Sequence, residues 1–127
     1  MNLIISMRKI TVGLMEPVKV RSKKRMVETL GKFDTGAKRT SIDRNLISRI
    51  GVKHVGRTST SNIHGTTVRP LVNVLLEIKG RKIKIQANVA DRSSRKYKIL
   101  LGRDVIFKNF IIDISKTHNS PELGDLK

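Results

Sequence analysis

Apolar and polar residues alternate through the second half of the chain, on both sides of a short turn. The segment before the turn carries Val72, Val74, Leu76 and Ile78 on one side. The segment after Lys79-Gly80 carries Ile83, Ile85, Ala87 and Val89 on one side, opposite Lys82, Lys84, Gln86 and Asn88. A period of two is typical of a strand with one buried face. The pattern therefore predicts a β-hairpin with one wet face, and a fold built mainly from strands.

The remaining segments extend this prediction. Strands are also expected over residues 8–14, 18–22, 26–33, 55–61, 66–78 and 97–101, and a final apolar strand from Phe107, Phe110, Ile111, Ile112 and Ile114. A helix is expected over residues 41–50, with Ser41 or Asp43 as its cap and Gly51 at its end. A second, short apolar helix follows Gly102-Arg103-Asp104.

The chain of 127 residues shows no internal repeat, linker or low-complexity tract. It is predicted to form one all-β, barrel-like domain over residues 1–127, with one or two short helices. The core is expected at about residues 8–115, followed by a polar, frayed tail over residues 116–127.

A motif of four residues, Asp34-Thr35-Gly36-Ala37, follows the extended segment that ends at Phe33. Asp and Gly favour ordinary turns, so the motif has a purely structural interpretation. It is also typical of aspartic peptidases, in which two carboxylates share one proton and act as acid and base. The chain carries this motif once. A second Asp34 would therefore have to come from another copy across a two-fold axis.

A second segment strengthens the functional interpretation. An apolar stretch runs from Tyr97 into Leu100-Leu101-Gly102-Arg103, and together with the Asp34 motif it resembles the retropepsins, the retroviral-type peptidases. That resemblance implies a homodimeric acid-protease barrel in which the two segments pack together beneath the site. It implies Asp34 as the catalytic carboxylate, Thr35 as a hydrogen-bonding residue across the dimer, and Gly36 as the point where two backbones approach closely. The turn of Asn62, Ile63, His64 and Gly65 matches the substrate-closing flap, although a plain surface turn remains the alternative.

A narrower resemblance covers about residues 10–112. Residues 11–18, 34–38 and 91–103 are similar to a bacterial and archaeal family labelled "ATP-dependent zinc protease", often encoded near a ligase that adds glutamates to a ribosomal protein. Its sequence pattern is that of a retropepsin-like aspartic peptidase. This chain departs from the pattern at Arg39, Arg95 and Lys98, which place cations on segments adjoining the site. Lys38 either faces solvent or stabilises the ionised Asp34 carboxylate.

The sequence contains no motif for binding the zinc or the ATP that the family's label names. The chain contains His54, His64 and His118 but no Cys, no His-Glu-x-x-His motif and no close His pair, whereas a catalytic zinc takes three protein ligands. Gly31-Lys32 lacks the rest of a phosphate-binding loop. We expect neither a metal site nor a cofactor.

The net charge of +17 is the other strong signal. Self-repulsion on this scale favours an anionic partner, such as an acidic peptide, RNA or the ribosome. The densest run, residues 19–25, is by itself typical of a solvated loop. Scarce aromatics argue against base stacking but leave phosphate-backbone binding open.

No stretch is long enough for a membrane span or a signal-peptide core, so a cytoplasmic location without a membrane partner is expected. The sequence thus favours a homodimeric aspartic endopeptidase, with acidic peptides as candidate substrates. The alternative is a basic RNA- or ribosome-binding module on a catalytically inactive retropepsin fold.

Overall fold

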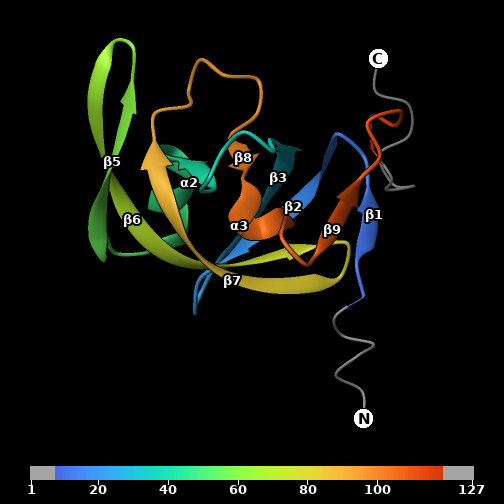
Figure 1. Cartoon of the computed structure of the whole chain (residues 1–127). Helices are drawn as coiled ribbons and strands as arrows, with labels where there is room; N and C mark the ends of the chain where they lie inside the picture. The colour runs from blue at the N-terminus through green and yellow to red at the C-terminus, as the bar shows by residue number, and fades with distance from the viewer. Residues whose placement is uncertain (1–7, 119–127) are drawn as a thin grey trace.

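The computed structural model describes residues 8–118, which form strands and two short helices (Figure 1). The strands are β1 (Ile10–Val12), β2 (Met15–Arg21), β3 (Met26–Phe33), β4 (Ser41–Asp43), β5 (Gly56–Asn62), β6 (Gly65–Ile78), β7 (Arg81–Ala90), β8 (Ile99–Leu101) and β9 (Phe110–Ile112). The helices are α2 (Arg44–Ile50) and α3 (Arg103–Ile106). Neither helix has the length and apolar character needed to cross a membrane in this part of the chain.

A closed barrel forms the body of the molecule. Its strands follow the order β2, β3, β8, β4, β7 and β6, and a short β2–β6 pairing at Lys19–Arg21 closes the circle. Two contacts in the circle are parallel, β3 with β8 and β4 with β7. The core lies inside and includes Val18, Val20, Ile42, Leu76, Ile78, Ile99 and Leu101, each 0% exposed. The predicted all-β barrel with two short helices is confirmed.

The β6–β7 hairpin has the predicted register and faces. Leu76 pairs with Ile83, and the turn residues Lys79 (φ 53°) and Gly80 (φ 79°) both adopt the left-handed backbone that a two-residue hairpin turn requires. One residue of the predicted wet face differs, because Asn88 is only 6% exposed. Asn88 lies where β4 joins β7 on its other edge, opposite Ser41.

The first half of β6 leaves the barrel and pairs with β5 from Gly56↔Leu71 to Asn62↔Gly65. This hairpin projects from the barrel at the left of Figure 1. We call it the flap hairpin. Its turn falls at the predicted residues, and Ile63 at the tip is 95% exposed. The barrel and the flap hairpin are therefore joined by one uninterrupted strand.

Near the N-terminus the predicted break is in the wrong place. The chain turns at Gly13-Leu14 rather than in the gap around Glu16-Pro17 between the predicted strands 8–14 and 18–22, and β2 continues through Pro17. The buried Glu16 side chain accepts the Gly13 N–H at 2.8 Å, which stabilises the turn. Within the described residues, β2 pairs at Pro17 with β3 alone. The other edge of β2 is unpaired there, so it accommodates a residue that has no backbone N–H to donate.

The predicted helix over residues 41–50 is too long. Residues 41–43 form β4 between β7 and β8, and the helix begins at Arg44. Of the two proposed caps, Asp43 is the one used, since its carboxylate accepts the Asn45 N–H at 3.3 Å. Gly51 ends the helix with φ 70°, as predicted. Ile42 is buried as a strand residue rather than as part of the helix face.

The last predicted strand is also shorter than expected. β9 contains only Phe110–Ile112 and pairs in parallel with β1. Phe107 and Ile114 lie outside it and are 69% and 82% exposed. The beginning of the tail is not frayed, because the carbonyls of Lys116 and Thr117 accept the N–H groups of Leu14 and Met15 at 3.0 and 2.9 Å. Residues 119–127 of the predicted tail lie outside the described part.

Candidate active site

Asp34 lies directly after β3, in a turn fixed by hydrogen bonds on both sides. Its N–H donates to the Leu101 carbonyl of β8 at 2.8 Å, and its carbonyl accepts the Ala37 N–H at 3.2 Å. The carboxylate oxygen Oδ1 accepts the Gly36 N–H at 2.9 Å. A Cβ at position 36 would lie 3.2 Å from that oxygen, so glycine permits this close approach. The Asp34 carboxylate is thus oriented by its own turn and remains half-exposed.

The Leu-Leu-Gly-Arg segment packs against this turn, as the resemblance implied. Arg103 Nη1 donates to the Thr35 carbonyl at 3.0 Å, and the Arg103 N–H donates to the Ala37 carbonyl at 2.8 Å. Gly102 lies so close that a Cβ there would be 2.8 Å from the Ala37 carbonyl oxygen. Two predicted segments separated by more than sixty positions therefore form one structural unit.

A buried pair, Thr40 and Asp104, completes this unit. The Thr40 side chain is 0% exposed and donates its hydroxyl to Asp104 Oδ1 at 2.7 Å. The same hydroxyl accepts the Gly102 N–H at 3.1 Å, and the Thr40 N–H reaches both Asp104 oxygens. These bonds join the end of the Asp34 loop to α3. Sequence reasoning assigned neither residue to the site.

A cleft of about 490 Å³ lies between the Asp34 loop and the flap hairpin. From the loop it is lined by Gly36, Ala37, Lys38 and Arg39, and from the flap hairpin by Thr58, Ser59, Thr60 and Ser61. The flap side of the cleft is therefore made of Ser and Thr residues, whose side chains alternate between the two faces of β5. Such a wall offers hydrogen bonds to a polar ligand and little apolar contact.

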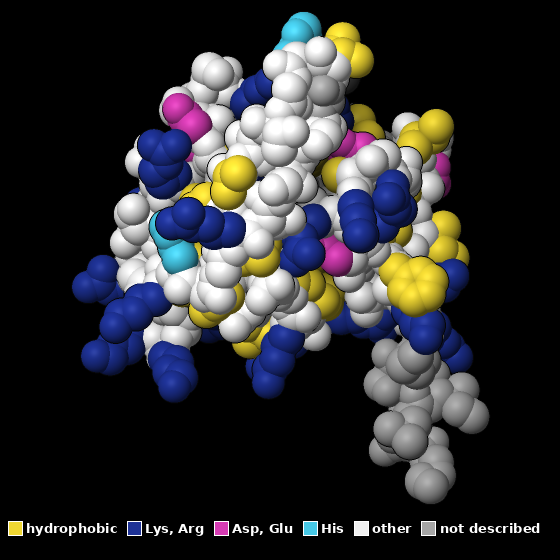
Figure 2. All heavy atoms as spheres, turned by 60° about the vertical axis from the view of Figure 1, so that its left-hand side comes forward, with side chains coloured by type: hydrophobic (Ala, Val, Ile, Leu, Met, Phe, Trp, Pro, Cys, Tyr) yellow, Lys and Arg dark blue, Asp and Glu magenta, His cyan; other side chains and the backbone are white. Residues whose placement is uncertain are grey.

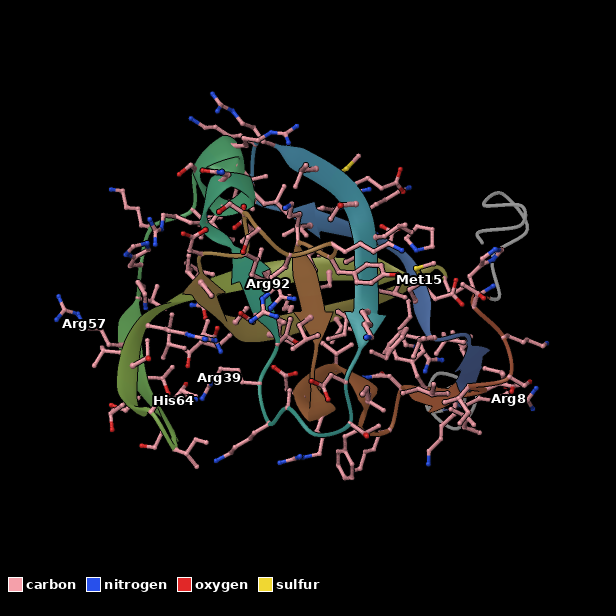
Figure 3. All side chains as sticks on the ribbon, turned by 90° about the horizontal axis from the view of Figure 1, so that it is seen from above. Arg8, Met15, Arg39, Arg57, His64 and Arg92 are labelled. Carbon is pink, nitrogen blue, oxygen red and sulfur yellow. The ribbon has the colours of Figure 1, made fainter. Side chains whose placement is uncertain are left out.

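Three arginines from separate elements also line this cleft: Arg39, Arg69 and Arg92. Arg39 Nη1 donates to the Gln86 carbonyl at 2.9 Å, and Arg69 Nη1 donates to Asn88 Oδ1 at 3.3 Å. Figure 3 shows Arg39 in the region between the Asp34 loop and the flap hairpin. The cleft is therefore strongly cationic. Asp34 is not among its lining residues, which begin two positions later in the same loop, at Gly36.

Arg92 shows the electrostatic effect of this crowding. Burial is the main cause that lowers the pKa of its guanidinium, and the neighbouring Arg95 and Arg69 lower it further. Asp43 and Asp34 act in the opposite direction. Arg92 Nε donates to the Tyr97 carbonyl at 2.9 Å, which keeps the side chain in place. An anionic group entering the cleft would relieve the repulsion among these cations.

The other predicted residues lie around the cleft with different exposures. Thr35 and Lys38 are exposed, in agreement with the solvent-facing interpretation of Lys38. His64 is exposed at the flap tip (Figure 3), and the cleft is lined by the arms of the flap hairpin rather than by that tip. Lys98 donates to the carbonyls of Arg92, Ser93 and Arg95 at 2.8–3.1 Å, so this departure from the family pattern organises the neighbouring loop.

Residues 8–118 contain no cluster of three or more His, Asp or Glu side chains with metal-binding geometry. The residues missed from the sequence had weak signals. A hydroxyl-rich run over residues 58–61 precedes the flap turn, and Arg92 lies in a motif that the resemblance had already singled out. No sequence signal links Arg69 to Arg39, because their proximity depends on how β6 crosses the barrel.

Solved structures show the same fold. A protein of unknown function (DUF785) from Legionella pneumophila is 22% identical, with a TM-score of 0.60 over 87% of this chain and 97% of that one. EIAV protease in complex with the inhibitor HBY-793 is 22% identical, with a TM-score of 0.57 over 72% and 83%. A foamy viral protease-reverse transcriptase bound to an RNA/DNA hybrid is 26% identical, with a TM-score of 0.51 over 73% and 11%.

No protein-family model and no curated protein matches the sequence. The structural similarities show that this chain has the retropepsin-like acid-protease fold.

Proposed function

We propose that the chain is an aspartic endopeptidase that acts as a homodimer, with one Asp34 from each copy. The observation that carries this proposal is the Asp34 turn, whose carboxylate is oriented by the Gly36 N–H at 2.9 Å and stays half-exposed, two residues before the part of the loop that lines the cleft. The resemblance to the bacterial and archaeal family, and the intact Leu101-Gly102-Arg103 support of the turn, favour an active site over a merely structural turn.

The reaction follows from two carboxyl groups that share one proton. The ionised Asp34 takes a proton from water as that water attacks the peptide carbonyl carbon, while the protonated Asp34 of the second copy donates to the carbonyl oxygen. The C–N bond then breaks as the nitrogen receives a proton, giving a carboxylic acid and an amine. Thr35 would support the dyad across the dimer, and the flap over residues 62–65 would close over the bound peptide.

We further propose that the substrate is an acidic peptide. Each guanidinium of Arg39, Arg69 and Arg92 is held by a contact to the protein, and a guanidinium carries five N–H donors. Donors therefore remain for a carboxylate. The Ser and Thr residues from Thr58 to Ser61 that line the cleft suit the polar backbone and side chains of such a peptide.

The decisive test is Asp34→Asn, assayed for cleavage of a glutamate-rich peptide. The variant should lose the activity while it keeps its thermal unfolding transition, because an amide cannot exchange the proton. A transition-state mimic with a central hydroxyl should inhibit the unmodified protein, whereas a chelator should not. Activity that survives in Asp34→Asn, or that a chelator removes and zinc restores, would contradict the proposal.

Substrate preference has its own matched control. Arg69→Gln should lower kcat/KM for the glutamate-rich peptide about tenfold relative to a glutamine-rich peptide, because it removes one charge from the cleft. Arg57→Gln removes the same charge from an exposed position of β5 that does not line the cleft and should change the ratio little. An equal effect of both variants would mean that overall charge, not the cleft, selects the peptide.

The net charge of +17 favours a second candidate, an RNA- or ribosome-binding module without catalysis. RNA held by the outer basic surface should ignore the active-site inhibitor and should dissociate as salt rises. Tight RNA binding at physiological salt, together with no cleavage of any peptide, would favour this candidate.

A further inference from the structure

A second groove lies outside the catalytic cleft, between the β2–β3 turn, the end of α2 and the outer face of β6. It is a depression of about 760 Å³ that continues into a second one of about 720 Å³, and the two share Ser22, Lys23 and Asn73. Volumes of this size are typical of ligand sites. We call this continuous depression the outer groove. It is separate from the proposed catalytic role of Asp34.

The rim of the outer groove is cationic. Lys23, Lys24, Arg25 and Lys53 line the first depression, and Arg21 and Lys84 line the second. No Asp or Glu is among the described residues that line either depression, although Arg21 makes one ion pair with Glu77 at 3.4 Å. Figure 2 shows Lys and Arg side chains gathered along the lower part of one face, with few acidic side chains among them. The rim therefore fits an anionic partner.

The basic turn is ordered, which distinguishes it from a loosely solvated loop. The Ser22 hydroxyl oxygen accepts the N–H groups of Lys24 and Arg25 at 3.4 and 3.1 Å, and the Ser22 N–H donates to the Arg25 carbonyl at 2.9 Å. Arg25 Nη1 reaches the Arg49 carbonyl at the end of α2, at 3.2 Å. The backbone of the turn and the Arg25 guanidinium are consequently held in place at the edge of the groove.

The floor of the outer groove is aliphatic. Ile50, Val52 and Val55 line the first depression, and Val74, Leu75 and Ile85 line the second. Val55 is 52% exposed, so an aliphatic side chain of a partner could cover it. Neither depression is lined by an aromatic residue on which a nucleic-acid base could stack. Cations around an aliphatic floor match carboxylates interspersed with aliphatic side chains better than they match a chain of phosphates.

We propose that the outer groove binds an acidic polypeptide segment that also carries aliphatic side chains. The carboxylates contact Lys23, Lys24 and Lys53 at the rim, and the aliphatic side chains cover Val55 and its neighbours on the floor. Binding here does not require Asp34. The groove serves as a docking surface for a partner protein, independent of peptide cleavage.

The test measures the binding of a fluorescent peptide with a Glu-Glu-Leu repeat to the full chain at physiological salt. Lys23→Glu/Lys24→Glu should weaken binding at least about tenfold. Lys9→Glu/Lys116→Glu makes the same change in charge at exposed positions outside the groove and should have an effect of about twofold at most. The measurement is made with the active-site inhibitor present, so that the peptide cannot enter the catalytic cleft. Under that condition Asp34→Asn should leave the affinity unchanged, so that failure of the groove and failure of the proposed catalysis can be distinguished.

A second pair of variants tests the floor. Val55→Ser should weaken binding of the Glu-Glu-Leu peptide about fivefold and leave binding of a Glu-Glu-Ser peptide unchanged. Only the leucine side chain gains from apolar contact with the floor. Val68→Ser changes a comparably exposed valine on the flap hairpin and should alter neither. The proposal is overturned if both peptides bind the unmodified protein equally well. It is also overturned if an oligouridylate binds more tightly than the leucine peptide and loses affinity in Lys23→Glu/Lys24→Glu.

Discussion

Thr40 supports the Asp34 loop through a side chain that is fully buried. Its buried hydroxyl donates to Asp104 and accepts from Gly102, which joins β4 to the start of α3. Burial matters because a polar group that loses its partner inside a protein cannot recover the lost bond from water. The Asp34 turn is therefore positioned partly by a residue that touches no substrate.

Thr40→Val keeps the shape of the side chain but removes both hydroxyl contacts. We expect the free energy of unfolding to fall by about 1–3 kcal/mol, because the Gly102 N–H loses its acceptor in a buried place. Urea denaturation gives this value directly. Thr67→Val, at an exposed position of β6, is the matched control and should change stability by less than about 0.5 kcal/mol. Similar losses in the two variants would contradict the assigned role.

At the scale of the elements, the end of α2 is controlled by Gly51. Its φ of 70° lies in the left-handed region, and its N–H donates to the carbonyls of Ile47 and Ser48 at 3.1 and 3.3 Å. A Cβ at this position would meet no atom within 4 Å, so the cost of a side chain is purely conformational. A substitution at Gly51 therefore measures backbone strain without a contribution from side-chain packing.

Gly51→Ala should lower the free energy of unfolding by about 1 kcal/mol, because alanine adopts left-handed backbone poorly. Gly51→Asn should cost less, since asparagine tolerates this conformation better. Thermal or urea unfolding of the two variants, measured side by side, checks the order. Equal losses would mean that the side chain meets an obstruction.

Local patterns predicted many elements because those patterns lie within single segments. The β6–β7 hairpin follows from alternation, and the ends of α2 follow from Asp43 and Gly51. The sequence could not separate β4 from α2, because three residues such as Ser41–Asp43 are too few to show a period. The parallel contacts, such as Gly31 with Ile99, join distant segments and leave no local signal. The same reason explains why the Asp34 turn was predictable while the convergence of Arg39, Arg69 and Arg92 was not.

At the scale of the whole molecule, the proposed dimer must overcome its own charge. Each copy carries +17, and association brings two such charges together. Exposed apolar side chains favour association, among them Leu14, Phe107, Ile111 and Ile114. Electrostatic repulsion between exposed groups is screened by salt, whereas apolar contact is not weakened by it.

The dimer should therefore tighten as salt rises, in contrast to the binding of any anionic partner. Between about 0.05 and 0.5 M salt we expect the dissociation constant to fall by about tenfold. Sedimentation equilibrium over a concentration series measures it. A dissociation constant that rises with salt would indicate that association depends on opposite charges, and a chain that stays monomeric throughout would contradict the homodimer.

The groups that support Asp34 come from residues much later in the chain, and this determines the order in which the site can form during synthesis. The Asp34 N–H, the Thr35 carbonyl and the Ala37 carbonyl are held by Leu101 and Arg103. During synthesis on the ribosome, the motif leaves the exit tunnel long before those residues have been added. A nascent chain thus contains the proposed catalytic carboxylate without the scaffold that orients it. The proposed hydrolysis therefore cannot begin before Leu101 and Arg103 have been made and have packed against the turn.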